Sequence, residues 1–176
     1  MDSNPYYAND RHAVLIGLRT LSIITSLPVF PALAWAIPAH SGVANDGVGF
    51  SIIPGVVAAT AYAFLWSTIV LILRLALNKP IHPGFYIGFD FFAFGIIASM
   101  TILMICFITP WVASDYNCEY STPDCKGFTL RRVEWFGAIM ALICCATHLV
   151  LFVWACWATD EDRKAKKLAS RKGVSA

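Results

Sequence analysis

Four long apolar segments, separated by short polar clusters, run along the chain. Each is longer than the roughly 20 residues that an α-helix needs to cross a bilayer. We place the spans at about 12–37, 52–77, 84–111 and 134–158. The pattern predicts an all-α membrane protein, an antiparallel four-helix transmembrane bundle that occupies residues 12–158.

Prolines divide the first of these segments. Pro28 and Pro31 fall in its outer half and are expected to kink the helix, and Pro38 is expected to end it. The segment is also too long for the apolar region of a signal peptide, about 7–15 residues. We therefore expect it to remain as the first span, after a polar tail at residues 1–11.

Composition agrees with a polytopic membrane protein. Hydrophobic residues make up 58% of the 176 residues and charged residues only 14%, whereas a soluble domain carries about 25% charged residues. No room is left for a separate soluble domain, and the expected partner is the lipid bilayer rather than a nucleic acid.

Basic residues suggest the orientation of the bundle. If both termini are cytoplasmic, that side holds Arg11, Arg74, Lys79 and six basic residues of the C-terminal tail, residues 159–176. The outside then holds three basic residues, Lys126, Arg131 and Arg132. The rule that positive charge stays inside favours this arrangement, although the two outer arginines oppose it.

Asp90 is the residue that most needs explanation. An ionised carboxylate inside a membrane is costly and is usually paired and functional. Arg19 and Arg74 fall near the same end of the bundle, so the three side chains are candidates for a buried ion pair. Alternatively, both arginines extend to the interface and Asp90 bonds to a hydroxyl or the backbone. We favour the ion pair over a proton relay, which needs further intramembrane acids.

Small residues predict where helices pack closely. Gly55, Ala59 and Ala63 recur every four residues in the second span, and such a ridge lets another helix approach. A comparable face in the third span carries Gly84, Gly88 and Gly95.

Cysteine and histidine positions suggest structural roles. Cys118 and Cys125 lie in a polar outer loop, where an oxidising compartment favours a disulfide. Cysteines within the spans are expected to be apolar packing residues. His148, near the middle of the fourth span, is expected to bond to another helix at a depth that keeps it away from Asp90. We expect no metal, no cofactor and no Ser-His-Asp catalytic set.

The C-terminal tail is basic. Its residues are expected either to bind anionic lipid, at about 1 kcal/mol each, or only to fix the topology, and the two roles are compatible. The candidates are Arg163, Lys164, Lys166, Lys167, Arg171 and Lys172.

Short motifs in the third span resemble those of a known family. The run from His82 to Gly84, followed by aromatic residues around Asp90, is similar to the third span of fungal MARVEL-domain membrane proteins. Arg74 near the end of the second span and a cysteine-containing second outer loop are also similar. The resemblance covers 12–158 and implies a role in organising membrane patches, membrane apposition or vesicle trafficking.

The expected function is therefore non-enzymatic. The protein would organise membranes through contacts with lipids, including anionic lipids or sterols, and with copies of itself or other membrane proteins. The plasma membrane or secretory vesicles are the expected location. The alternative is a small membrane enzyme or transporter for an apolar substrate, which needs a polar cavity with at least two convergent reactive groups.

Overall fold

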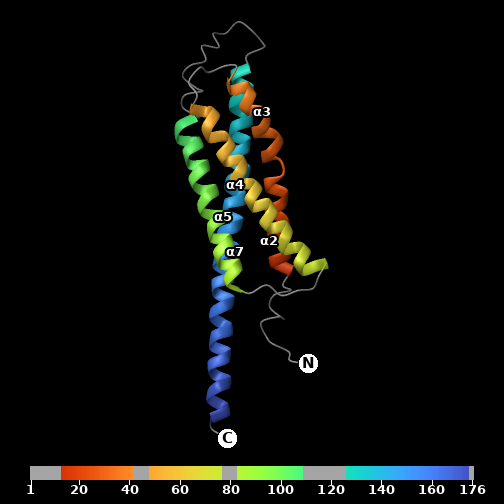
Figure 1. The fold of residues 1–176 in the computed structure, drawn as a ribbon, viewed down its shortest axis with the longest axis vertical. Helices are drawn as coiled ribbons and strands as arrows, with labels where there is room; N and C mark the ends of the chain where they lie inside the picture. The colour runs from red at the N-terminus through yellow and green to blue at the C-terminus, as the bar shows by residue number, and fades with distance from the viewer. Residues whose placement is uncertain (1–12, 42–47, 77–82, 109–125, 175–176) are drawn as a thin grey trace.

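The computed structural model describes residues 13–41, 48–76, 83–108 and 126–174, and all of these residues are helical or in the short turn between two helices. Four helical segments are long and apolar enough to cross a membrane. These segments are Ala13–Ala39, Ile52–Ala76, Gly84–Cys106 and Thr129–Glu161. The protein is thus an all-helical integral membrane protein, and its helices lie side by side in a bundle (Figure 1).

The first span consists of two helices, α2 (Ala13–Ser26) and α3 (Val29–Ser41). The break has a direct cause, because Pro28 and Pro31 have no backbone N–H to donate. Two backbone hydrogen bonds flank it, from Leu27 N to Ile23 O at 3.1 Å and from Ala32 N to Pro28 O at 3.3 Å. The expected kink is therefore a full interruption of the helix.

The hydroxyl groups beside this break bond to backbone carbonyls. Thr25 donates to the carbonyls of Leu21 and Ser22, and Ser26 donates to that of Ile23. Side-chain hydroxyls satisfy backbone groups in this way where a helix is interrupted inside a membrane. Pro38 was expected to end the first span, but this was wrong: Pro38 lies inside α3, which continues to Ser41.

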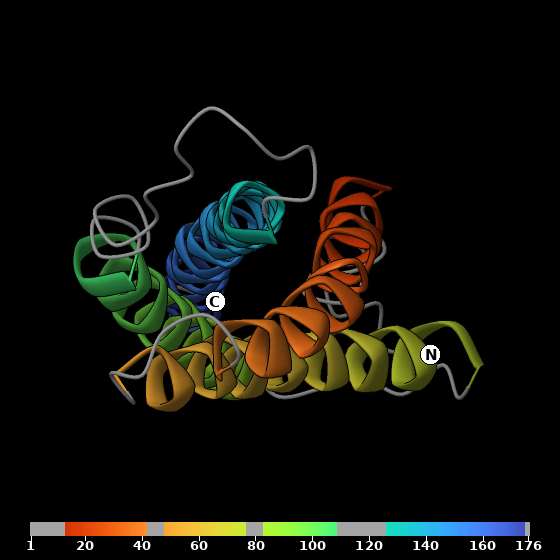
Figure 2. The ribbon, with the colours of Figure 1, turned by 90° about the horizontal axis from the view of Figure 1, so that it is seen from above.

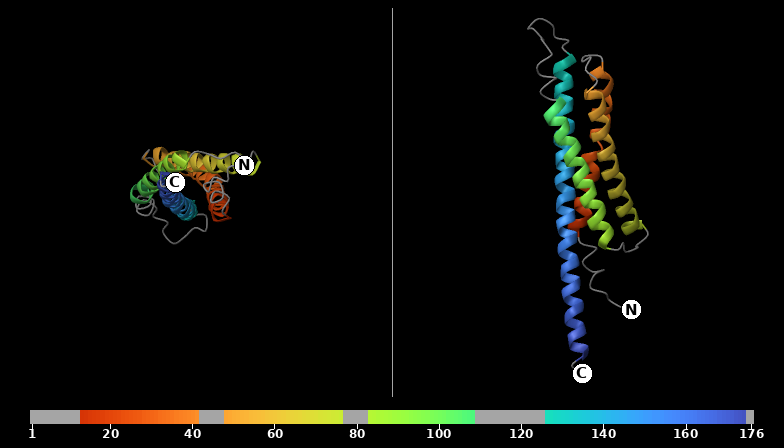
Figure 3. Two further views of the ribbon diagram at one scale, coloured as in Figure 1. Left: turned by 90° about the horizontal axis from the view of Figure 1, so that it is seen from below. Right: turned by 60° about the vertical axis from the view of Figure 1, so that its left-hand side comes forward.

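The second and third spans each end in a π-helical turn. The second consists of α4 (Val48–Leu71) and η1 (Ile72–Ala76). The third consists of α5 (Pro83–Leu103) and η2 (Met104–Ile108). The fourth span belongs to α7 (Lys126–Val174), a single helix of 49 residues. It starts before the expected residue 134 and continues through the charged tail, beyond the other helices (Figure 3).

The bundle closes around a core of small and branched side chains. The first span packs on α4 and α7, and α5 packs between α4 and α7, as the view from above shows (Figure 2). On α4, Ala59 and Ala63 are fully buried, and a Cβ on Gly55 would lie 2.9 Å from the sulfur of Met100 on α5. The ridge of small residues on α4 therefore lies inside the bundle.

Large apolar side chains cover the outside. Residues such as Leu65 on α4, Phe91 on α5 and Val153 on α7 are more than half exposed. An exposed apolar surface of this extent marks contact with lipid or with another protein. It is the surface expected of a bundle whose solvent is hydrocarbon.

Candidate functional site: a buried polar network around Asp90

Asp90 on α5 receives hydrogen bonds from each of the other three spans. Arg19 on α2 donates twice, from Nη1 to Oδ1 at 2.7 Å and from Nη2 to Oδ2 at 2.5 Å. Trp66 on α4 donates its Nε1–H to Oδ1 at 3.0 Å, and His148 Nδ1 on α7 lies 3.0 Å from the same oxygen. One fully buried carboxylate therefore ties the whole bundle together.

The Arg19–Asp90 pair makes the buried charge tolerable. A guanidinium and a carboxylate matched by two parallel hydrogen bonds form one of the strongest polar pairs in proteins. Arg19 is only 1% exposed and Asp90 is fully buried, so neither group reaches water. The pair carries no net charge, which reduces the cost of placing it in a low-dielectric interior.

His148 continues the network toward α2 and α4. Its Nε2 lies 2.9 Å from Ser22 Oγ, and the Ser67 hydroxyl donates to Ser22 Oγ at 3.1 Å. An ionised carboxylate can only accept hydrogen bonds, so His148 carries a hydrogen on Nδ1 and this N–H donates a hydrogen bond to Asp90. When the His148 ring is neutral, its Nε2 accepts a hydrogen bond from the Ser22 hydroxyl, and Ser22 accepts one from Ser67. Each of these groups then has a partner.

Aromatic rings enclose the cationic part of the network. The guanidinium carbon of Arg19 lies 5.7 Å from the ring centroids of both Trp66 and Tyr86, within the range of a cation–π contact. Phe89, next to Asp90, stacks on Trp66 with centroids 4.4 Å apart. The aromatic residues around Asp90 thus exclude lipid and hold the indole that bonds to the carboxylate.

Arg74 occupies a different position from Arg19. Its Nε donates to the Tyr86 hydroxyl at 2.7 Å, and its guanidinium carbon lies 5.4 Å from that ring. Tyr86 therefore separates the two arginines, and Asp90 pairs with Arg19. Of the three residues proposed for the ion pair, two form it and Arg74 adjoins it through Tyr86.

One expectation about this region was wrong. His148 was expected to lie too deep to reach Asp90, but α5 and α7 pack side by side with these two residues at the same level, and His148 Nδ1 lies 3.0 Å from the Asp90 carboxylate. Ser22, His148 and Asp90 are also hydrogen-bonded in that order, whereas the absence of a catalytic Ser-His-Asp set stays a prediction. The sequence signal for Ser22 was present, since it lies three residues after Arg19 on one face of α2.

The small-residue face of the third span lies outside this network. Gly84 and Gly88 are exposed, and no described atom of another helix lies within 4 Å of a Cβ placed on Gly88 or Gly95. This face is therefore open to the membrane, whereas the corresponding ridge on α4 is closed by α5.

Four of the six cysteines lie in the part of the chain that the structure describes. Cys118 and Cys125 lie outside the described residues, so their disulfide stays a prediction. Cys106, Cys144, Cys145 and Cys156 are free thiols. Cys144 lies 3.7 Å, sulfur to oxygen, from the Ser22 hydroxyl, at the edge of the polar network.

The basic tail is the last part of α7. Residues 159–174 are helical and extend away from the bundle (Figure 1). The ammonium group of Lys164 lies 2.7 Å from the Asp160 carboxylate and 3.3 Å from that of Glu161, and the hydrogen bond to Asp160 raises the pKa of Lys164. A helix rises about 1.5 Å per residue, so Arg171 and Lys172 lie well beyond the end of the span at Glu161.

No protein-family model matches the chain, and comparison with curated proteins and with solved structures gives no match either. The chemistry of the site must therefore be judged from its geometry. A carboxylate bound by three helices and neutralised by an arginine can brace a bundle. The adjoining histidine and serines can also orient or move a proton.

Proposed function

We propose that this protein is a tetraspan membrane organiser without catalytic activity, with an antiparallel bundle and both termini in the cytoplasm. Its resemblance to fungal MARVEL-domain proteins suggests work at the plasma membrane or on secretory vesicles, in membrane patches, apposition or trafficking. Lateral contacts with lipids, with copies of itself or with other membrane proteins carry out this role.

The closed state of the Asp90 network is the observation that carries this proposal. Arg19, Ser22, Ser67, Asp90 and His148 are each at most 1% exposed. These groups bond to one another, and apart from Arg19 Nε, which has no hydrogen-bond partner, their polar atoms hold the helices together. The surface available for interaction is then the apolar outside of the bundle, which suits lateral contacts in a bilayer.

Three features support the orientation. Consecutive spans alternate in direction in Figure 1. The basic end of α7 follows the positive-inside rule when it is cytoplasmic. Trp35 and Trp135, at the opposite end, are partly exposed, as aromatic residues at a membrane interface usually are.

The experiment that tests the proposal is reconstitution of fluorescently labelled protein into giant vesicles. We expect the wild type to form clusters, and Gly88→Leu to cluster less, because leucine covers an open small-residue face through which copies can approach. Photobleaching step counts measure cluster size. Leu65→Ala, at an exposed position on α4, is the control and should cluster like the wild type. Wild-type protein that stays monomeric at all densities would contradict the proposal.

A membrane enzyme is the second candidate, because Ser22, His148 and Asp90 are bonded in the order of a serine hydrolase triad. The same geometry argues against it, since Ser22 is fully buried and Asp90 is already neutralised by Arg19. We expect a lipophilic fluorophosphonate to leave Ser22 unmodified in native membranes. Mass spectrometry of the labelled chain measures this, with Ser22→Ala as the control. Labelling that disappears in Ser22→Ala would favour the enzyme.

A further inference from the structure

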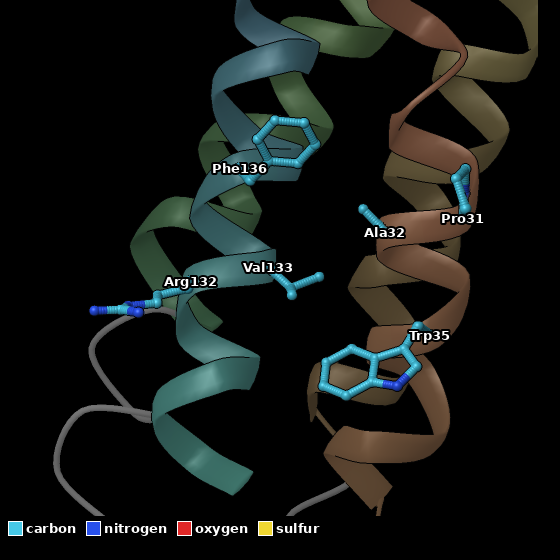
Figure 4. Close-up of a pocket in the computed structure, with 6 residues that line it drawn as sticks. All are labelled: Pro31, Ala32, Trp35, Arg132, Val133 and Phe136. Atoms are coloured by element: carbon cyan, nitrogen blue, oxygen red, sulfur yellow. The ribbon is translucent and has the colours of Figure 1, made fainter.

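The two ends of the bundle differ in what they offer to a partner. At one end, a groove between α3 and α7 is lined mainly by apolar side chains, including Trp35, Val133 and Phe136. The Arg132 side chain points away from this groove (Figure 4). At the other end, α7 continues past the bundle as residues 159–174, the α7 extension, which holds six basic residues (Figure 3). Positive charge is thus concentrated on the α7 extension.

The α7 extension stands clear of the third span. His148 on α7 and Asp90 on α5 are bonded at one level, and α5 begins at Pro83, seven residues before Asp90. The two helices run in opposite directions in Figure 1, so α7 passes the start of α5 near Ala155. At about 1.5 Å per residue, roughly 28 Å of α7 then lies beyond the start of α5.

Three basic residues form a row along the α7 extension. Arg163, Lys167 and Arg171 recur every four residues of a continuous helix. Residues four apart are neighbours on one face of a helix, so these positions place a charge about every 6 Å along the axis. The side chains of Arg163 and Lys167 are exposed. We call these three residues the basic row.

The charge of the basic row is not neutralised within the described part of the chain. The ammonium group of Lys164 lies 2.7 Å from the Asp160 carboxylate and 3.3 Å from that of Glu161, so these two acids are paired outside the row. Among the residues that the structure describes, neither Arg163 nor Lys167 forms an ion pair. Their charges are therefore available to a partner.

Lipid of the surrounding membrane is poorly placed to be that partner. Headgroups add only about 5–7 Å to each side of the hydrocarbon, and physiological salt screens charges more than about 8 Å apart. Lys167 and Arg171 lie about 18 and 24 Å past the start of α5, beyond both distances together. A second membrane facing the first would meet only the tip of the helix and not the length of the row.

We propose that the basic row binds an acidic helix of a partner protein, which approaches from the aqueous phase and lies alongside the α7 extension. Carboxylates at every fourth residue of a helix are also about 6 Å apart, so the two rows match in spacing. Charges paired between neighbouring helices select partners in this way in coiled coils. This inference goes beyond the proposed organising role and does not depend on it.

The test uses the full chain in nanodiscs of phosphatidylcholine and two fluorescent alanine-rich peptides of about 20 residues, long enough to form helices. One peptide has three glutamates four residues apart, and the other has the same three glutamates next to one another. Fluorescence anisotropy at low salt measures binding. We expect about tenfold tighter binding of the spaced peptide, the combined effect of three exposed ion pairs.

Two double variants separate the row from net charge. Arg163→Gln with Lys167→Gln removes two charges from the row and should abolish the preference for the spaced peptide. Lys166→Gln with Lys172→Gln removes two charges outside the row and should keep that preference. All four positions lie beyond the bundle, so the circular dichroism of both variants should match that of the wild type.

Two results would overturn the proposal. Equal affinity of the wild type for the two peptides, or equal losses in the two double variants, would mean that net charge alone attracts anions. Phosphatidylserine vesicles that displace the spaced peptide, where phosphatidylcholine vesicles do not, would assign the basic row to a facing membrane instead.

Discussion

Replacing Asp90 with asparagine is expected to lower the free energy of unfolding by about 3 to 5 kcal/mol, the cost of removing one partner from a buried ion pair. Asparagine keeps an oxygen that accepts from Trp66 and His148, but it leaves the Arg19 guanidinium buried without its counter-charge. Unfolding of the purified protein in mixed micelles with increasing SDS, followed by circular dichroism, measures the change.

Two further variants show whether the charge is the cause. Glu161→Gln removes an exposed acid from α7 and should change stability by less than about 0.5 kcal/mol. The double variant Arg19→Met with Asp90→Leu removes both charges, and buried pairs replaced by apolar residues often lose little stability. It should therefore be more stable than Asp90→Asn. Wild-type stability of Asp90→Asn would disprove the bracing role.

Gly137→Leu is expected to lower the free energy of unfolding by about 2 kcal/mol, because overpacking the contact with Leu33 costs more than the helix propensity gained. The added Cβ alone would lie 2.6 Å from Leu33 Cδ2, and Leu33 is fully buried, so it cannot move away freely. The same SDS titration measures the effect.

Gly88→Leu is the matched control on α5. No described atom of another helix lies within 4 Å of its Cβ position, so leucine gains propensity without a clash. We expect Gly88→Leu to be as stable as the wild type or slightly more so. A second substitution, Leu33→Ala, should restore part of the stability of Gly137→Leu. Equal effects at Gly88 and Gly137 would show that the two glycines have similar surroundings.

Hydrophobic patterning was sufficient for the four membrane-spanning helices, because an apolar run of bilayer length has few other stable structures. The ends of the helices were harder to predict. The i,i+4 spacing of Asp160 and Lys164 favours further helical turns after 158, and α7 continues through them as far as Val174. Pro38 was expected to end the first span, but one missing N–H does not always terminate a helix.

The site was only partly visible in the sequence. Asp90 stood out because an acid inside a span is rare, and the arginines stood out for the same reason. Which arginine pairs with it depends on the relative heights and rotations of the helices, and these follow from packing rather than from periodicity. Trp66 was missed because its ring resembles other apolar residues, while its single N–H is what reaches Asp90.

The assignment to MARVEL-domain proteins stays a prediction. The proposed function depends on a braced bundle rather than on catalytic residues. Variants that weaken the network around Asp90 therefore test this function.

The continuity of α7 has a mechanical consequence. At about 1.5 Å per residue, its 49 residues form a shaft of roughly 70 Å that joins one surface of the membrane to the other. A partner that tilts or twists the charged end of α7 would also move His148, because a continuous helix has no hinge between the two. We therefore expect a ligand bound at the tail to affect the opposite end of the bundle through this one helix.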